Sequence, residues 1–322
     1  MTDRSTVPDA VGVVLPRDLP AAEVLPYARR ADELGFGSLW VVEDMSFRGG
    51  FAQAGAVLAA TSRIHVALGI APAAVRNAAF TAMEAATLAE LFPGRFTLGI
   101  GHGSMGWMRQ VSAWPPSPLG LLTEHLDAVR ALLRGETVTT RGRYVQLDGV
   151  RLVAPPELPP AVVAGVRGPK SLAVSGAHAD GTLLAEPITP EYARAARAHI
   201  GAGDGHLLHG YLLSAVDEDA DVARQRVRPA LEVAGMPDFA PHVATSPYAA
   251  DLAALRVDSA DDQDFARRIP DAWVDDLALV GTPTRLRERL AELRAAGLQR
   301  PILFPVAEDR REALTGLAAA VL

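Results

Sequence analysis

Short runs rich in valine, isoleucine and leucine recur along the 322 residues, and each is followed by a segment with the period of an amphipathic helix. The expected strands, in chain order, cover residues 11–15, 38–42, 64–70, 96–100, 161–165, 182–185, 210–216 and 301–305. Such alternation is typical of parallel sheets flanked by helices. Because the units number eight and no interdomain linker separates them, the pattern favours a closed TIM (β/α)8 barrel over a doubly wound open sheet.

The alternation is interrupted twice. Residues 137–147 have the pattern of a hairpin and lead into a proline-rich connector at 154–160. Residues 236–276 are acidic, contain prolines and show no clear period. We therefore expect one barrel domain over residues 1–322, with an excursion at 135–160 and an insertion at 236–276.

The stretch from Gly101 to Gly106 has the GxGxxG spelling of a dinucleotide-binding turn and directly follows the expected fourth strand. Such a turn needs a helix that begins on its glycines, because the helix N-terminus supplies the N–H groups for the pyrophosphate. Here prolines follow at 115, 116 and 118, and the next expected helix begins only near Leu119. The context of a Rossmann turn is therefore missing.

Composition excludes several classes of function. The net charge is −7 and the basic residues are scattered, so there is no electrostatic footprint for nucleic acid or an anionic membrane. The chain has no cysteine, which excludes disulfides, thiolate metal sites and a cysteine nucleophile. Residues 1–6 lead into no apolar signal core, and no apolar run is long enough to span a bilayer. We expect a cytoplasmic, metal-free protein that acts on a small molecule.

Four stretches, in order, resemble the luciferase-like monooxygenase superfamily. They are ADELGFGSLWVVED (31–44), LAELFPGRFTLGIGHG (88–103), VAGVRGPKSLAVSGAHADGTLL (163–184) and LVGTPTRLRERLAELRAAGL (279–298). They look most similar to its deazaflavin-dependent oxidoreductase branch, which includes the methylene-tetrahydromethanopterin reductases. The resemblance implies a TIM barrel that binds coenzyme F420 or, alternatively, FMN without a covalent link. We also expect a homodimer.

The resemblance places Gly99, Gly101 and Gly103 beside the flavin, where glycine would let a planar ring approach the backbone closely. It also matches Gly69–Ile70 to a non-prolyl cis peptide that supports the ring from behind. For Asn77, just before the third helix, a helix cap and a cofactor contact are equally plausible.

A candidate anion site follows the expected fifth strand, at Gly165, Val166, Arg167, Gly168, Pro169 and Lys170. Proline in the first helical turn leaves the neighbouring N–H groups available, so the start of this helix can bind an anion. Lys170 is the only lysine in the chain. An ordinary helix start is the alternative, but the basic residues and the resemblance favour a site for the cofactor phosphate.

Residues at strand ends are also candidates for proton transfer. Glu43 and Asp44 end the second strand, where adjacent carboxylates could orient a cofactor or move a proton. His102 follows the fourth strand between two glycines, and an imidazole can exchange protons near neutral pH. Solvated acids and a packed histidine are the alternatives. Glu186, at the end of the sixth strand, could face the same space or solvent.

These observations together predict an oxidoreductase that transfers a hydride between F420 and an organic small molecule. An FMN-dependent monooxygenase using O2 and a non-catalytic flavin-binding barrel are the alternatives, because fold does not fix function. The residues that would choose the substrate lie in 104–118 and 236–276, where the resemblance is weakest. Trp107, Met108 and Trp114 are either walls of a substrate site or packing for a long loop.

Overall fold

The computed structural model describes residues 11–322. Residues 1–10, which include the start expected to carry no signal core, lie outside the described part of the chain. Eight parallel strands follow one another around a closed ring in the order β9-β11-β1-β2-β3-β4-β7-β8, and β8 pairs with β9 to complete it. The barrel strands are β1 (Gly12–Leu15), β2 (Ser38–Val41), β3 (His65–Pro72), β4 (Phe96–Gly101), β7 (Ala161–Gly165), β8 (Gly181–Leu184), β9 (Leu207–Val216) and β11 (Arg300–Pro305). The predicted TIM barrel is confirmed.

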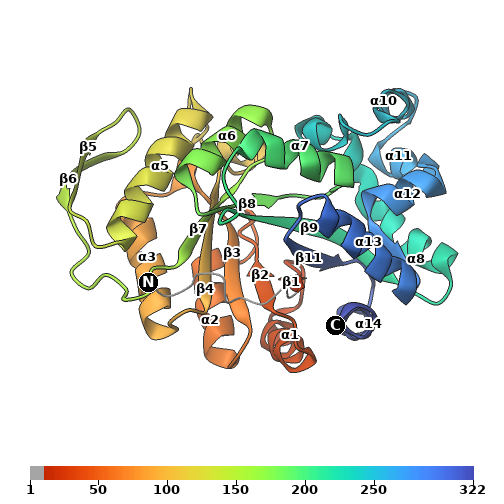
Figure 1. The fold of residues 1–322 in the computed structure, drawn as a ribbon, viewed down its shortest axis with the longest axis horizontal. Helices are drawn as coiled ribbons and strands as arrows, with labels where there is room; N and C mark the ends of the chain where they lie inside the picture. Colours follow the sequence, from red (N-terminus) through yellow and green to blue (C-terminus); the bar gives the residue numbers. More distant parts are fainter. Residues whose placement is uncertain (1–10) are drawn as a thin grey trace.

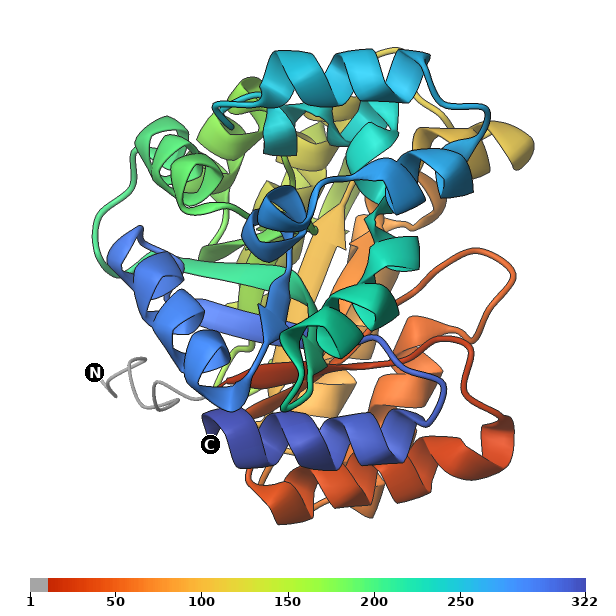
Figure 2. The ribbon, with the colours of Figure 1, turned by 90° about the vertical axis from the view of Figure 1, so that its right-hand side faces the viewer.

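Helices surround this ring, as Figures 1 and 2 show from two directions. Those that connect successive barrel strands are α1 (Ala21–Leu34), α2 (Gly50–Ala60), α3 (Ala78–Leu91), α5 (Pro118–Leu133), α6 (Pro169–His178), α7 (Pro190–Ile200), α8 (Ala220–Val227) and α13 (Pro283–Ala295), and α14 (Arg310–Val321) follows the last strand. Within residues 11–322, no helix is both long and apolar enough to cross a bilayer. Because the eight barrel strands are parallel, their carboxyl ends all lie at one end of the barrel, which we call the barrel mouth.

The barrel interior is filled by large apolar side chains from alternate strand positions. They are Val14, Trp40, Ala67, Val163, Leu183, Tyr211 and Ile302. Trp40 and Tyr211 are both buried and meet edge to face, with ring centroids 6.0 Å apart. A second and larger apolar layer lies between the strands and the helices. The interior is thus packed, and chemistry is left to the residues at the barrel mouth.

β9 is longer than the other strands and has two partners along one edge. β8 pairs with its first residues, from Leu207 to Gly210, and the short β10 (Leu279–Gly281) pairs with Ser214 to Val216. The sequence pattern does not predict β10, because three residues are too few to show a period. β10 therefore flanks the closed ring without being part of it.

The two interruptions form separate additions to the barrel. β5 (Val138–Arg141) and β6 (Gln146–Val150) form an antiparallel hairpin that projects beside α5 (Figure 1). The second addition consists of η2 (Arg228–Gly235), η3 (Pro237–Phe239), α9 (Ala240–Val243), α10 (Ala249–Val257), α11 (Asp262–Arg268) and α12 (Asp271–Leu277).

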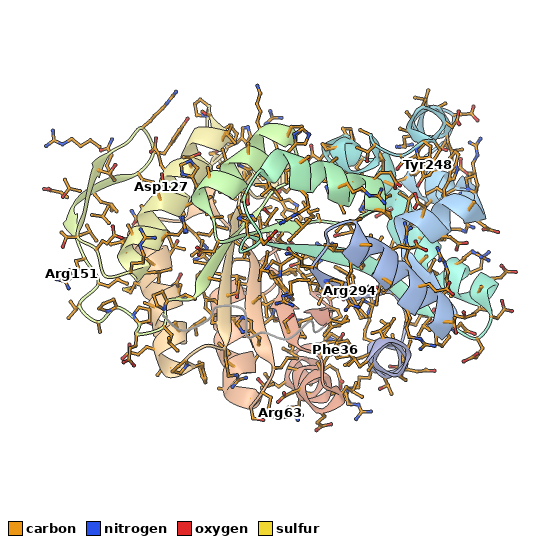
Figure 3. All side chains as sticks on the ribbon, in the orientation of Figure 1. Phe36, Arg63, Asp127, Arg151, Tyr248 and Arg294 are labelled. Atoms are coloured by element: carbon orange, nitrogen blue, oxygen red, sulfur yellow. The ribbon has the colours of Figure 1, made fainter. Side chains whose placement is uncertain are left out.

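The helical addition has an apolar core of its own, which includes the fully buried Phe265. Tyr248, labelled in Figure 3, lies in this addition. It stacks on Trp273 at 4.7 Å between ring centroids and donates a hydrogen bond to Asp276 at 2.6 Å. The segment shows no period in the sequence because its helices are too short to repeat a pattern.

One expectation about the glycine motif is wrong. A short helix, α4 (Met105–Gln110), does begin directly behind Gly101 and Gly103. It ends before the prolines, and its cap residue Ser104 makes no side-chain hydrogen bond to it. The motif nevertheless lies in a closed barrel rather than in an open Rossmann sheet.

Candidate active site

The peptide bond between Gly69 and Ile70, near the end of β3, is cis, as the resemblance predicts. The register between β3 and β4 shifts at the same place. The Gly69 carbonyl oxygen accepts a hydrogen bond of 2.9 Å from the buried Tyr211 hydroxyl. Tyr211 therefore links the middle of β9 to the cis peptide across the barrel interior.

The glycines of β4 and β7 make room for Ile70. A Cβ atom added to Gly101 or Gly165 would collide with the Ile70 side chain, and one added to Gly99 would collide with the Leu68 carbonyl oxygen. The Ile70 side chain thus lies beside Gly101 and Gly165, and the expected close approach of a planar ring to the β4 glycines stays a prediction. Ile70 itself is partly exposed, so it is the surface on this side that a ring could contact.

Gly103 is a glycine for a different reason. Its φ of +75° lies in the left-handed region, which residues with a Cβ rarely adopt. Met108 packs against this turn and is buried, which supports a packing role for it. Trp107 and Trp114 are only partly buried.

Glu43 is held by two partners at the start of α2. Its carboxylate accepts hydrogen bonds of 2.7 and 2.8 Å from the Arg76 guanidinium and one of 2.9 Å from the Gly50 N–H. Arg76 also bonds Glu84 at 2.9 Å and lies 4.8 Å over the Phe51 ring. These contacts favour a structural role for Glu43, as an anion that caps the helix.

Asp44 pairs with Arg17, which follows β1. The Arg17 guanidinium also lies 4.8 Å over the ring of Phe47, an exposed residue. This ion pair is partly exposed and lies at the barrel mouth. Asp44 is therefore present where the sequence predicts it, with a positive partner.

His102 joins three elements. Its Nε2 atom lies 3.2 Å from the Ser171 hydroxyl in the first turn of α6, and the ring also interacts with the backbone of Pro118 at the start of α5. Burial lowers the pKa of His102, and the nearby positive charge of Arg167 lowers it further, whereas the Pro118 backbone opposes the shift. These influences favour the neutral ring, and its contacts with α5 and α6 favour a structural role; the proton-donor role expected for His102 stays a prediction.

The β7–α6 turn is an open helix start. Gly168 is the cap residue of α6, provides no side-chain hydrogen bond, and has no atom within 4 Å of its Cβ position. Within residues 11–322, seven other helices begin with a side chain that accepts a backbone N–H. Those cap residues are Asn77, Ser117, Thr189, Asp219, Asp261, Thr282 and Asp309. The sequence left the role of Asn77 open, and the structure assigns it as a helix cap.

The side chains of this turn point in different directions. Pro169 and Lys170 are exposed, but Val166 is buried and donates its N–H to the Leu183 carbonyl. Arg167 donates to the Asp238 carbonyl at 3.0 Å and stacks 4.3 Å over the Phe239 ring.

Arg167 therefore contacts the helical addition, and the backbone at Gly168 remains the available anion-binding feature. In the same addition, the fully buried His242 packs against Tyr192, and its Nδ1 atom lies 3.0 Å from the Pro187 carbonyl oxygen. Burial lowers the pKa of His242 to about 3, and the charge of Arg167 contributes.

Two further residues lie in the barrel, Tyr211 in its interior and Glu186 at its mouth. Tyr211 lies inside β9 and carries no motif, so only its inward position in the strand could have revealed it. Glu186 follows β8 and is partly buried. Burial raises the pKa of Glu186, and the negative charge of Asp44 adds to this, while Arg167 and Arg17 oppose it. Burial also raises the pKa of Tyr211, with contributions from Glu186 and Asp44.

A groove of about 1350 Å³ opens beside the ends of β1, β9 and β11. Each of its arginines has an acidic partner: Arg226 pairs with Asp217, Arg310 with Asp18 and Arg311 with Glu23. Glu308, Asp309 and Glu312 add further negative charge. An anionic cofactor is therefore repelled from this groove, in contrast to the start of α6.

Comparison with known proteins gives a consistent set of matches. The model of the family described as Luciferase-like monooxygenase matches residues 6–300. The chain is 25% identical over 308 residues to a 5,10-methylenetetrahydromethanopterin reductase of Methanolobus tindarius, covering 92% of this chain and 94% of that protein.

Among solved structures, a coenzyme F420-dependent tetrahydromethanopterin reductase from Methanopyrus kandleri superposes with a TM-score of 0.81 at 20% identity. An F420-dependent secondary alcohol dehydrogenase in complex with an F420–acetone adduct superposes with a TM-score of 0.76 at 19% identity. Both alignments cover 97% of this chain and 98% of the other. At these identities the structural likeness establishes the shared fold.

Proposed function

The chain belongs to the luciferase-like monooxygenase family, and from this premise we propose that it transfers a hydride between coenzyme F420 and an organic small molecule. The chain is a luciferase-like oxidoreductase. The identity of its cofactor and the reaction it catalyses are our proposal. The names of the similar reductases and of the alcohol dehydrogenase support F420. The observation that carries the proposal is the uncapped start of α6, which follows a strand whose last residue, Gly165, packs against Ile70.

The residues at the barrel mouth fit such a cofactor. The first turn of a helix has N–H groups without intrahelical acceptors, and in α6 these include the amides of Lys170 and Ser171. Space at Gly168 and the proline at 169 leave these amides accessible to a phosphate. Ile70 would support the ring. A bound deazaflavin would supply hydride chemistry and, unlike reduced FMN, does not activate O2.

The direct test is a fluorescence titration of the purified chain with F420 and with FMN. We expect tighter binding of F420, and weaker binding of a riboflavin-like fragment that lacks the phosphate. Equal or reversed affinities, together with oxygen uptake coupled to substrate loss, would favour the FMN-dependent monooxygenase. Binding without any turnover would favour the non-catalytic flavin-binding barrel.

We also propose that two copies of the chain associate through the outer faces of α2 and α3. α2 contains no charged residue, and α3 exposes Phe80, Met83 and Leu91. Large apolar side chains that are exposed on one helix are typical of an interface, and the small residues on α2 would allow a second copy to approach closely. Light scattering should show a dimer for the wild type and a monomer for Phe80→Glu. A monomeric wild type would contradict this assembly.

A further inference from the structure

We propose that a cavity on the side of the barrel binds a small, singly charged carboxylate. The cavity has a volume of about 310 Å³ and lies between the start of α3, the first half of α5 and the β5–β6 hairpin. Figure 1 shows these elements on the same side of the molecule. None of residues 165–170 lines the cavity, so it is separate from the start of α6. Binding there does not depend on the proposed hydride transfer.

The wall of this cavity contains a buried histidine that lacks a hydrogen-bond partner at one nitrogen. His125 of α5 is 1% exposed, and its Nε2 atom has no partner among residues 11–322. Burial lowers the pKa of His125 to about 4, and the charge of Arg76 contributes, so the ring is neutral at pH 7. A neutral imidazole can carry its proton on Nε2 and donate it there. Because buried polar groups are nearly always hydrogen-bonded, we expect an acceptor for it inside the cavity.

Two further donors line the same cavity. The Tyr144 hydroxyl accepts the Ser117 N–H at 2.8 Å, which leaves its own proton available. At the start of α3, the Asn77 side chain accepts the Ala79 N–H at 2.9 Å, and the Ala78 N–H remains for a ligand. A carboxylate is an acceptor with two oxygens, so it can accept hydrogen bonds from several such donors at once.

The hairpin is held in place by α5, the helix that also carries His125. The Glu124 carboxylate of this helix accepts the N–H groups of Tyr144 at 2.7 Å and Val145 at 2.8 Å. The Tyr144 hydroxyl and the His125 ring are therefore positioned before a ligand arrives. Donors that are already in place lower the entropy cost of binding.

The charges around the cavity favour one negative charge over two. Arg76 lines the cavity, and its positive charge acts on His125. The same guanidinium is bonded to Glu43 at 2.7 Å and to Glu84 at 2.9 Å. These two carboxylates would repel a doubly charged phosphate strongly, whereas a single charge is favoured by the neutral donors and by the positive end of α3. A carboxylate therefore fits this cavity better than a phosphate does.

The first experiment titrates the purified chain at pH 7 with acetate, propionate and benzoate, at an ionic strength held constant with chloride. The ring signals of His125 are followed by NMR, and we expect a saturable shift with at least one of the three carboxylates. The matched neutral amides lack the charge, so they should bind roughly 10- to 100-fold more weakly, and inorganic phosphate should also bind more weakly. No saturable shift with any carboxylate would overturn the proposal. An amide or phosphate that binds as tightly as the best carboxylate would overturn it as well.

The second experiment compares His125→Leu with His125→Gln, with binding measured by calorimetry and folding by thermal unfolding. Leucine fills the space without a donor, so it should weaken carboxylate binding roughly 10- to 100-fold, whereas the glutamine amide can donate and should retain most of the affinity. Tyr144→Phe, at a partly exposed position, removes a second donor and should cost about tenfold. It provides the test if the substitutions at the buried histidine do not fold. Unchanged affinity in the folded members of this set would overturn the proposal.

Discussion

Two helices of the barrel begin in a similar way and end up with different partners. α2 follows β2 and α6 follows β7, and both begin behind a glycine cap residue, Gly49 and Gly168, that makes no side-chain hydrogen bond. At α2 the Glu43 carboxylate accepts the Gly50 N–H at 2.9 Å. At α6 no carboxylate takes this position, and the space around Gly168 is open.

The difference identifies where a ligand anion can bind. A helix N-terminus carries a partial positive charge and unpaired N–H groups, so an anion is favoured at both places. The chain supplies its own anion to α2 and neutralises it with Arg76. At α6 the nearby arginine, Arg167, is directed to Asp238 instead. The start of α6 is therefore the one of the two that a cofactor phosphate could complete.

Giving the start of α6 its own carboxylate should abolish its difference from the start of α2. The resulting loss of F420 affinity is the largest effect we expect. Gly168→Asp places an acceptor over the first-turn amides, and its charge repels a phosphate. Loss of two charged hydrogen bonds of about 1.5 kcal/mol each predicts roughly 100-fold weaker binding of F420. Thermal unfolding of the cofactor-free variant should show no loss of stability, because aspartate is a favourable cap.

Gly168→Ala is the matched control. The φ of −89° suits any residue, and no atom lies within 4 Å of the Cβ position, so the backbone should be unchanged. F420 affinity should stay near that of the wild type. If Gly168→Asp binds F420 as well as Gly168→Ala does, the phosphate is not at this helix start.

Removing the internal anion from α2 should affect stability rather than binding. Glu43→Ala deletes the bonds to Arg76 and Gly50, and we expect the free energy of unfolding in urea to fall by about 1.5–3 kcal/mol. Glu84→Ala removes the more exposed partner of the same arginine, so its cost should be at most about 1 kcal/mol. A stable Glu43→Ala protein that binds F420 but has lost activity would instead assign Glu43 to catalysis.

The fold is largely present in the sequence, since each barrel strand and each connecting helix has a strong local pattern. The exceptions are short elements. α4 has six residues and β10 has three, and such lengths are fixed by their tertiary neighbours rather than by a period. The helices of the second addition are missed for the same reason.

The site is less predictable, because contacts between distant residues decide the role of each side chain. Glu43 meets Arg76, 33 residues away, and Arg167 meets Asp238, 71 residues away. Strand-end position places these residues at the barrel mouth but cannot say which are already paired. The start of α6 is recognisable from local sequence, whereas the cis bond at Gly69–Ile70 is indicated only by the family resemblance.

Acid should loosen the α6 side of the mouth more than the α2 side. Burial holds the pKa of His242 near 3, whereas an opened segment restores about 6.5. The closed state is therefore favoured above pH 6.5 and loses this stabilisation as the pH falls toward 3. Between pH 7 and pH 5 the equilibrium for opening residues 240–243 should increase roughly 25-fold.

Hydrogen exchange, corrected for the intrinsic effect of pH, measures this difference. Amides of α9 should become less protected at pH 5, and those at the start of α2 should change far less. His242→Gln cannot titrate and should remove the response. Equal responses at α2 and α9 would show that the acid effect is not local to His242.

The smallest effect concerns the one lysine. Lys170 is exposed in the first turn of α6, where a positive side chain is unfavourable for the helix but attracts an anion. Lys170→Met should weaken F420 binding by about 0.3–1 kcal/mol, or roughly two- to fivefold, and reduce its salt dependence. Riboflavin binding should not change. A loss as large as that of Gly168→Asp would mean that the lysine side chain, rather than the backbone, holds the phosphate. In that case α2 and α6 would bind anions in different ways, because at α2 the Glu43 carboxylate is bound by the Gly50 N–H as well as by the Arg76 side chain.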